Sequence, residues 1–273
     1  MNVAGVAIED TRAVSGGDIC QAWQGVLDGR PVFAKTLPGA PPSFFAAEAR
    51  GLALLRIDGA PPVPDVIAVA DDGLVLDWVE PGPPTRAAAD DFGRRLAVLH
   101  QASRPTFGAS HDGYIGTLAL PNTALQSWPQ FYVEHRVLPY LAALSADDRS
   151  TIERLCARID ELAGPAEPPS TIHGDLWSGN LLWGSNGVVR LVDAASAHGG
   201  HRETDLAMLA LFGAPYFDAM MAAYQEVSPL ADGWRQRVPL HQLHPLLVHA
   251  TLFGGGYGAR AATAALSALG LAS

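Results

Sequence analysis

The pattern of apolar and polar positions divides the chain into a strand-rich first part and a helix-rich remainder. In the first part, short apolar runs bounded by turn residues are typical of strands, and they cover residues 21–27, 31–36, 63–69 and 74–79. Asp28 and Gly29 separate the first two runs and indicate a hairpin turn. Residues 43–56 predict one helix, with Ser43 as its expected N-cap. The first part should therefore form a small sheet with one helix.

From about residue 85 onward, apolar residues take the three- and four-residue spacing of helices. Phe92, Leu96 and Leu99 recur at i, i+4 and i+7, which is the stripe of an amphipathic helix. Ser127 and Gln130 have the spacing of a capping box at the start of another helix, which should run towards Leu141. The remaining predicted helices cover residues 145–163, 204–212, 216–227, 240–253 and 258–269.

The two parts meet at a Pro-Gly-Pro-Pro sequence, residues 81–84. Such a stiff, turn-rich segment is typical of a linker. We therefore expect an N-terminal lobe of residues 1–80 and a C-terminal lobe of residues 81–273. The predicted fold class is α+β, with a small β-rich lobe and a larger, mainly helical one. Ligand sites favour the cleft between two such parts.

Composition narrows the class of protein. The 273 residues are 48% hydrophobic and 17% charged, so we expect a globular protein without a membrane span. The N-terminus lacks a basic region followed by an apolar core, so no signal peptide is expected. Only two cysteines are present, Cys20 and Cys156, which do not make a disulfide framework. A formal net charge of −10 disfavours nucleic-acid binding. We expect a cytoplasmic protein.

Residues 170–193 hold the strongest candidate for chemistry. Asp175 and Asn180 have the D-x-x-x-x-N spacing of a phosphotransferase loop, and Asp193 ends an apolar strand further along. An Asn-Gly turn at residues 186–187 predicts a hairpin that brings Asn180 beside Asp193. In phosphoryl transfer one Asp accepts the proton of the attacking hydroxyl, while Asn and a second Asp hold Mg²⁺. A His-Gly-Asp tripeptide alone is often only a turn, but the joint pattern predicts a kinase-like site.

The first lobe supplies a candidate phosphate clamp. Lys35, the only lysine of the chain, lies on an apolar strand, and Glu48 lies on the apolar face of the following helix. An unpaired carboxylate in that position would be costly, so we expect a Lys35–Glu48 pair like that of kinases. The alternative is that Lys35 is an exposed residue of an edge strand, as a lone lysine on a strand usually is.

Two further segments are candidates for ATP binding. Gly16 and Gly17 would form the turn that covers the phosphates, although any hairpin accepts a Gly-Gly turn. Asp77, Trp78 and Val79 precede the linker and would offer backbone hydrogen bonds to adenine, although a plain strand end has the same pattern.

Together these motifs resemble the fructosamine kinase (ketosamine-3-kinase) family, whose relatives are the aminoglycoside phosphotransferases. The resemblance covers nearly the whole chain and is carried by Ser-Gly-Gly-Asp-Ile (15–19), Phe-Ala-Lys (33–35), His-Gly-Asp-Leu-Trp-Ser-Gly-Asn (173–180), Gly-His-Arg-Glu-Thr-Asp (200–205) and Leu-Phe-Gly-Gly-Gly-Tyr (252–257). The segments around Trp177 and residues 201–203 are specific to this family rather than to kinases generally.

The resemblance implies a two-lobed protein-kinase-like fold and an enzyme that uses ATP and Mg²⁺. It implies phosphorylation of the sugar 3-hydroxyl of a ketosamine, such as a fructosamine or ribulosamine, which releases the adduct and repairs the glycated amine. Carried over by position, Asp175 would be the base, Asn180 and Asp193 the metal ligands, and Lys35 and Glu48 the phosphate clamp. Four further residues would lie near the sugar or support the loop: Trp177, His201, Arg202 and Glu203.

One segment departs from the family. Asp193 is followed by Ala-Ala-Ser-Ala-His-Gly-Gly, where the family usually has Pro-Ala and aromatic residues. The preferred ketosamine is therefore open, and so is a kinase of another small alcohol, aminoglycoside-like or choline-like. A pseudokinase is the non-enzymatic alternative. Cys20, beside the Gly-Gly turn, could be redox-sensitive. We expect a monomer that acts on a small molecule.

Several single residues have structural interpretations. His173 should order the catalytic loop through a hydrogen bond, and Asp205 should anchor that loop from a helix terminus. His241, His244 and His249 lack neighbouring acidic residues in the sequence, so no metal site is expected there.

Overall fold

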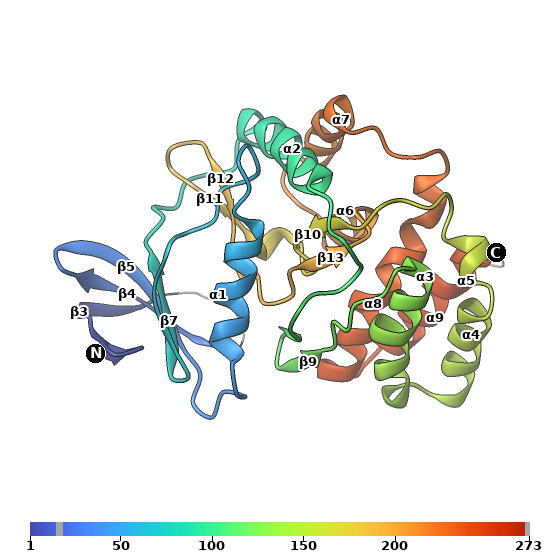
Figure 1. Cartoon of the computed structure of the whole chain (residues 1–273), viewed down its shortest axis with the longest axis horizontal. Coiled ribbons are helices and arrows are strands. Elements are labelled where there is room, and N and C mark those ends of the chain that lie inside the picture. The colour runs from blue at the N-terminus through green and yellow to red at the C-terminus, as the bar shows by residue number, and fades with distance from the viewer. Residues whose placement is uncertain (15–18, 271–273) are drawn as a thin grey trace.

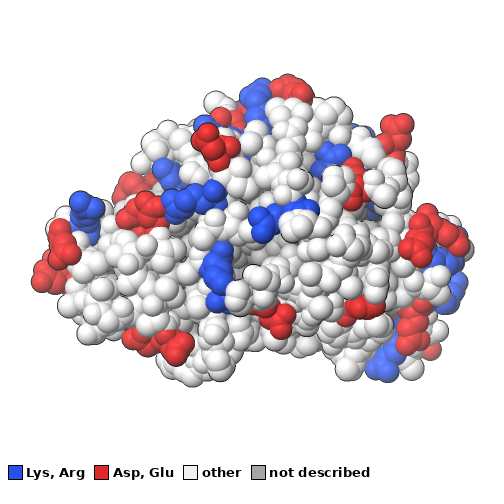
Figure 2. Space-filling model, viewed as in Figure 1, with Lys and Arg blue, Asp and Glu red and all other residues white. Residues whose placement is uncertain are grey.

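The computed structural model describes residues 1–14 and 19–270 (Figure 1). Gly16 and Gly17, the expected phosphate turn, lie outside the described residues. The described chain forms an α+β fold with a small β-rich lobe and a larger helical lobe, as predicted. Among the described residues, no helix is both long and apolar enough to cross a bilayer. On the face drawn in Figure 2, acidic and basic side chains are interspersed and no broad basic surface is present.

The small lobe is an antiparallel sheet with the strand order β3-β4-β5-β7-β6. Its strands are β3 (Glu9–Val14), β4 (Gln21–Leu27), β5 (Arg30–Thr36), β6 (Val66–Ala70) and β7 (Gly73–Asp77). Asp28 and Gly29 both have positive φ, as a two-residue hairpin turn requires. That turn pairs Leu27 with Arg30. A two-stranded ladder of β1 (Asn2–Val3) and β2 (Val6–Ala7) precedes the sheet.

Helix α1 (Phe44–Leu55) lies between this sheet and the large lobe (Figure 1). Phe45, Leu52 and Leu55 are fully buried, and they share one hydrophobic core with α2 of the large lobe. The predicted side-chain cap is wrong, because Ser43 has a left-handed backbone and its hydroxyl makes no capping hydrogen bond. Burial of the apolar face, rather than the cap, therefore fixes α1.

The large lobe contains the remaining helices. They are α2 (Arg86–Gln101), α3 (Trp128–Tyr132), η1 (Val133–Val137), η2 (Leu138–Ala143), α4 (Ala146–Cys156), α5 (Ile159–Leu162), η3 (Ser178–Asn180), α6 (Glu203–Phe212), α7 (Phe217–Val227), α8 (Trp234–Phe253) and α9 (Tyr257–Ala268). Only half of the predicted capping box forms: Ser127 Oγ accepts from the Gln130 N–H, while the Gln130 side chain donates to Glu134.

Three helix boundaries differ from the sequence prediction. The helix that begins after Ser127 changes to a π turn and then a 3₁₀ helix before Leu144. Residues 145–163 form two helices, α4 and α5, rather than one. Helix α8 begins at Trp234 and continues through Pro239 and Pro245. Packing of its buried residues against α6 and α9 outweighs the hydrogen bonds that two prolines remove.

Three short antiparallel strand pairs, not all of them predicted, surround the junction of the lobes. Two are hairpins, which pair β8 (Gly113–Ile115) with β9 (Leu118–Leu120) and β11 (Leu181–Trp183) with β12 (Val189–Leu191). In the third, β10 (Ser170–Ile172) pairs with β13 (His198–Gly200). The linker joins the β11–β12 hairpin, since the Gly82 N–H donates to the Trp183 carbonyl at 2.8 Å. The sheet ends at Asp77 and α2 begins at Arg86, and we retain the division into residues 1–80 and 81–273 as a proposal.

Candidate active site

The β11–β12 hairpin positions two of the expected functional residues. Leu181 pairs with Leu191 across the hairpin, and Gly187 takes the positive φ that its turn requires. Just beyond the paired strands, the Val192 N–H donates to the Asn180 carbonyl at 3.2 Å. The hairpin therefore brings Asn180 and Asp193 together, as the Asn-Gly turn predicted.

Asp175 and Asn180 are joined by hydrogen bonds. Asn180 Nδ2 donates to the Asp175 carbonyl at 2.7 Å and to Asp175 Oδ2 at 3.3 Å. The donor end of the amide is thereby used, which leaves Asn180 Oδ1 as its acceptor end. Burial raises the pKa of Asp175 to about 6, even though His173 and the Asn180 hydrogen bond act in the opposite direction. A carboxylate with this pKa can accept a proton near neutral pH.

Lys35 connects the two lobes. It is 5% exposed and Glu48 is 3% exposed, and Lys35 Nζ donates to Glu48 Oε2 at 2.8 Å. The predicted pair is formed, and the edge-residue alternative is wrong because β5 lies inside the sheet between β4 and β7. Lys35 Nζ also forms an ion pair with Asp193 Oδ1. Burial alone would lower the pKa of Lys35, but Glu48 and Asp193 together raise it, so the ammonium stays charged.

The loop that carries Asp175 is anchored by Asp205 of α6. Asp205 Oδ2 accepts from the His173 N–H at 2.8 Å, and Oδ1 accepts from the Gly174 N–H at 2.9 Å. His100 of α2 donates to the same carboxylate at 3.2 Å. His173 donates to the Val192 carbonyl at 2.9 Å. Both predicted structural interpretations, for His173 and for Asp205, are confirmed by these contacts.

A cavity of about 260 Å³ opens at this junction. Six of the residues expected from the sequence line it: Lys35, Glu48, Asp175, Trp177, Asn180 and Asp193. Its remaining walls come from α1, α6, α8, the β8–β9 hairpin and the segments that hold Cys20 and Ser196, and sequence spacing did not identify the residues that follow. They include Phe44, Tyr114, Phe212, His249, Leu252 and Phe253.

His201, Arg202 and Glu203 do not line this cavity, which favours the second of their two expected roles, support of the catalytic loop, over a place near the sugar. His201 is buried against Trp128 and His241. Arg202 forms a two-pronged pair with Glu167, at 2.6 and 2.7 Å. These side chains are satisfied inside the large lobe, behind the start of α6. Of the four residues expected near the sugar, only Trp177 lines the cavity.

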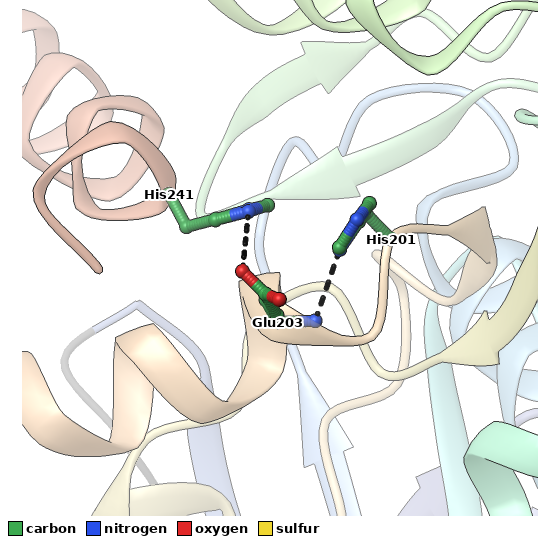
Figure 3. Close-up of side chains that lie close together, drawn as sticks. All are labelled: His201, Glu203 and His241. Atoms are coloured by element: carbon green, nitrogen blue, oxygen red, sulfur yellow. Dashed lines mark hydrogen bonds and ion pairs between the residues drawn. The ribbon is translucent and has the colours of Figure 1, made fainter. Parts of the chain in front are cut away.

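Glu203 lies with two histidines in a buried group that resembles a metal site (Figure 3). His241 Nε2 faces Glu203 Oε2 at 3.4 Å, so the expectation that His241 lacks an acidic neighbour is wrong. Arg237, however, donates to both Glu203 oxygens, at 2.9 and 2.6 Å. The guanidinium already neutralises this carboxylate and would repel a metal cation. The Arg237–Glu203 pair instead joins α8 to the start of α6.

Trp128, Phe131 and Tyr132 are buried in the core of the large lobe rather than exposed in the cleft. They surround a smaller space beside His198 and His244, separate from the cavity that Asp175 lines. These helix-face aromatics therefore belong to the core of the large lobe and not to the sugar side of the cleft.

The segment expected to bind adenine does not line the cavity. The Asp77 N–H donates to the Asp65 carbonyl at 3.0 Å, and the Trp78 N–H donates to the Pro31 carbonyl at 3.3 Å. Both donors are used within the small lobe. Among the described residues, the Val79 N–H has no acceptor, so it is the one donor of the three that stays available.

Cys20 lies half-buried in the cavity wall beside Lys35. Burial raises the pKa of its thiol, Lys35 acts in the opposite direction, and the negative charges of Glu48 and Asp193 add to the rise. A raised pKa lowers the thiolate fraction, and the thiolate is the reactive form. The site therefore does not activate Cys20.

Asp175, Asn180, Asp193 and a buried Lys–Glu pair in the cleft of a two-lobed α+β fold define a small-molecule kinase of the protein-kinase-like class. The solved structure of a thermostable mutant of aminoglycoside phosphotransferase APH(4)-Ia shares this fold, with a TM-score of 0.63 and 17% identity over 97% of this chain and 96% of that one.

The fructosamine kinase family model matches residues 2–269, and the chain belongs to that family. A probable ketoamine kinase of Thermus thermophilus is 38% identical over 245 residues, which cover 89% of this chain and 87% of the relative. A solved structure from Thermobifida fusca, described as a fructosamine-3-kinase, superposes with a TM-score of 0.91 at 46% identity, covering 98% of this chain and 96% of that one. The protein is therefore a kinase.

Proposed function

We propose that the protein transfers the γ-phosphoryl group of ATP to the 3-hydroxyl of a ketosamine, a fructosamine or ribulosamine. The observation that carries the proposal is the convergence of Lys35, Asp175, Asn180 and Asp193 on one cavity. Membership of the fructosamine kinase family supports the substrate class. Phosphorylation at this position would make the adduct leave the amine, so we assign the enzyme to the repair of glycated amines.

Asp175 is the proposed base. Its carboxylate would accept the proton of the attacking hydroxyl, and its pKa of about 6 keeps it ionised at pH 7 while leaving it basic enough to act. Asn180 holds this carboxylate through its amide N–H group. Asp205 fixes the backbone just before it, so the base cannot swing away from the acceptor.

The donor set fits Mg²⁺. Asn180 Oδ1 and the Asp193 carboxylate are oxygen ligands, which Mg²⁺ prefers, and the Asp193 side chain is 41% exposed towards the cleft. When bound, the ion would neutralise charge on the phosphates of ATP. Lys35 would contact those phosphates, held in place by Glu48.

The remaining nucleotide contacts are assigned by position. We place adenine at the end of β7, where the free Val79 N–H is the donor. Gly16 and Gly17 remain the proposed phosphate turn. Residues 201–203 support the catalytic loop through α6 instead of contacting the sugar. We place the enzyme in the cytoplasm, where ATP is available, and expect it to act as a monomer.

The test is Mg²⁺-dependent ATP consumption with a panel of acceptors. The panel contains fructose-lysine and ribulose-lysine beside an aminoglycoside and choline. We expect turnover on a ketosamine that Asp175→Asn abolishes, while this variant still binds nucleotide. Turnover confined to the aminoglycoside or choline would refute the substrate assignment, and near-parental turnover in Asp175→Asn would refute the base.

A further inference from the structure

The cavity wall is divided into a charged end and an apolar end. Its charged side chains, Lys35, Glu48, Asp175 and Asp193, all belong to the catalytic group. The rest of the wall is mostly apolar or aromatic, and it includes Phe44, Tyr114, Trp177, Met208, Phe212, Val248, Leu252 and Phe253. Beyond the catalytic group, the described wall residues include no further Lys, Arg, Asp or Glu, and they include one histidine, His249.

Large apolar side chains remain exposed in this wall. Ile19 is 37% exposed, Trp177 is 39% exposed and Phe253 is 60% exposed, and all three line the cavity. They come from the segment before β4, from the catalytic loop and from the end of α8. A Cβ built on Gly116 would meet Leu252 at 2.9 Å and Ile19 at 3.4 Å, so Ile19 of the small lobe lies close to the α8 side of the rim.

The aromatic side chains form a continuous series. The ring centroids of Trp177 and Phe212 are 6.2 Å apart, those of Phe212 and His249 are 5.0 Å apart, and those of His249 and Phe253 are 5.4 Å apart. These are the separations of interacting rings. The series leads from the loop that bears Asp175 to the exposed edge at Phe253.

Among the residues that the structure describes, a second cation in the substrate would find no partner in this wall. Glu48 and Asp193 are already paired with Lys35, and Asp175 is held by Asn180. An extra ammonium or carboxylate against this apolar wall would lose water without gaining a counter-charge, which is unfavourable. An alkyl or aryl group would instead bury apolar area against Trp177 and Phe253.

We infer that the amine carried by the ketosamine substrate is uncharged and apolar, alkyl or aromatic, beyond its own nitrogen. This inference rests on the proposed function. The reacting 3-hydroxyl and the ketosamine nitrogen are separated by three carbon atoms, so the group on the nitrogen extends away from Asp175. The aromatic series receives it, and Phe253 and Trp177 discriminate between amines.

Fructose adducts of four amines test the inference, three of them with matched five-carbon chains. Pentylamine and 3-phenylpropylamine supply apolar groups, while 1,5-diaminopentane and 5-aminopentanoate add one positive and one negative charge. With ATP and Mg²⁺ we expect kcat/KM to be at least about tenfold higher for the two apolar adducts, with most of the difference in KM. Equal kcat/KM for all four would overturn the inference and leave the proposed function standing. Failure on all four adducts would overturn both.

Variants of Phe253 test whether this side chain causes the preference for apolar amines. Because this side chain is exposed, Phe253→Ala should fold normally and reduce the preference for the 3-phenylpropylamine adduct several-fold. Phe253→Asp should raise kcat/KM for the 1,5-diaminopentane adduct relative to the parent, since it adds a counter-charge. Tyr216→Ala is the control, because Tyr216 is 49% exposed and lies outside the cavity wall. A preference unchanged in both Phe253 variants, or changed equally in Tyr216→Ala, contradicts the inference.

Discussion

Gly51 of α1 lies directly against the backbone carbonyl of Ala194, so closely that a Cβ at Gly51 would overlap that oxygen. Ala194 follows Asp193, the proposed metal ligand, and Gly51 lies one turn after Glu48 on the same helix. The absence of a side chain therefore allows α1 to approach the Asp193 segment and to place Glu48 beside Lys35. Backbone contact between the lobes and the Lys35 ion pairs depend on the same close approach.

Gly51→Ala should force α1 away from Ala194 and lengthen the Lys35–Glu48 contact. The side chain would meet backbone atoms that have no room to move, so we expect a loss of about 1–3 kcal/mol of stability together with reduced turnover. Thermal unfolding and initial rates measure the two effects. Ala53→Val adds bulk on the exposed side of the same helix and should leave both unchanged. Parental activity in Gly51→Ala would show that the approach is not needed.

Lys35→Met should weaken the use of ATP more than it weakens acceptor binding. The substitution removes the only lysine and leaves the Glu48 carboxylate buried without its partner. We expect kcat/KM for ATP to fall about a hundredfold or more, measured with the acceptor saturating. Arg94→Met removes an exposed cation that pairs with Glu226 at 2.8 Å, and it should behave like the parent. An unchanged ATP dependence in Lys35→Met would exclude the phosphate-clamp role.

The rate should fall as acid protonates Asp175. The folded-state pKa of about 6 means that the base is ionised above pH 6 and neutral below it. We therefore expect kcat/KM for the acceptor to be level above about pH 7 and to fall about tenfold per pH unit well below 6. A pH profile between 5 and 8 checks this, with Asp175→Asn lacking the transition. A parental profile that stays level down to pH 5 would contradict the assignment.

Asp205→Ala should disorder the loop before Asp175. It leaves the buried N–H groups of His173 and Gly174 without an acceptor, at about 1–3 kcal/mol each, and it removes one of the two hydrogen-bond partners of His100. We expect lower stability and a fall in kcat with a smaller change in KM, because the catalytic loop is affected more than the binding walls. Urea unfolding and saturation kinetics separate these quantities. Asp218→Ala removes an exposed acid in the first turn of α7 and should change neither.

The sequence determined the site centre and most elements because both depend on short-range signals. An Asn-Gly turn fixes the hairpin that joins Asn180 to Asp193, and an acidic residue on an apolar helix face required the partner that Lys35 supplies. Apolar spacing located α1 and the strands β4 and β5 to within about a residue at each end, and it marked the buried face of α2 without giving its ends. It could not place the start of α8, because two prolines that normally end a helix are overruled there by packing.

Only the tertiary structure decided which polar residues face the cavity. His201, Arg202 and Glu203 stand in a family motif, yet Glu167, Arg237 and Trp128, distant in the sequence, hold them inside the large lobe. The apolar wall at Phe212 and Phe253 is likewise assembled from helices that touch only after folding. Spacing along a chain specifies neighbours within a turn or hairpin, whereas the direction a side chain faces depends on long-range packing and on which charged partner it meets there.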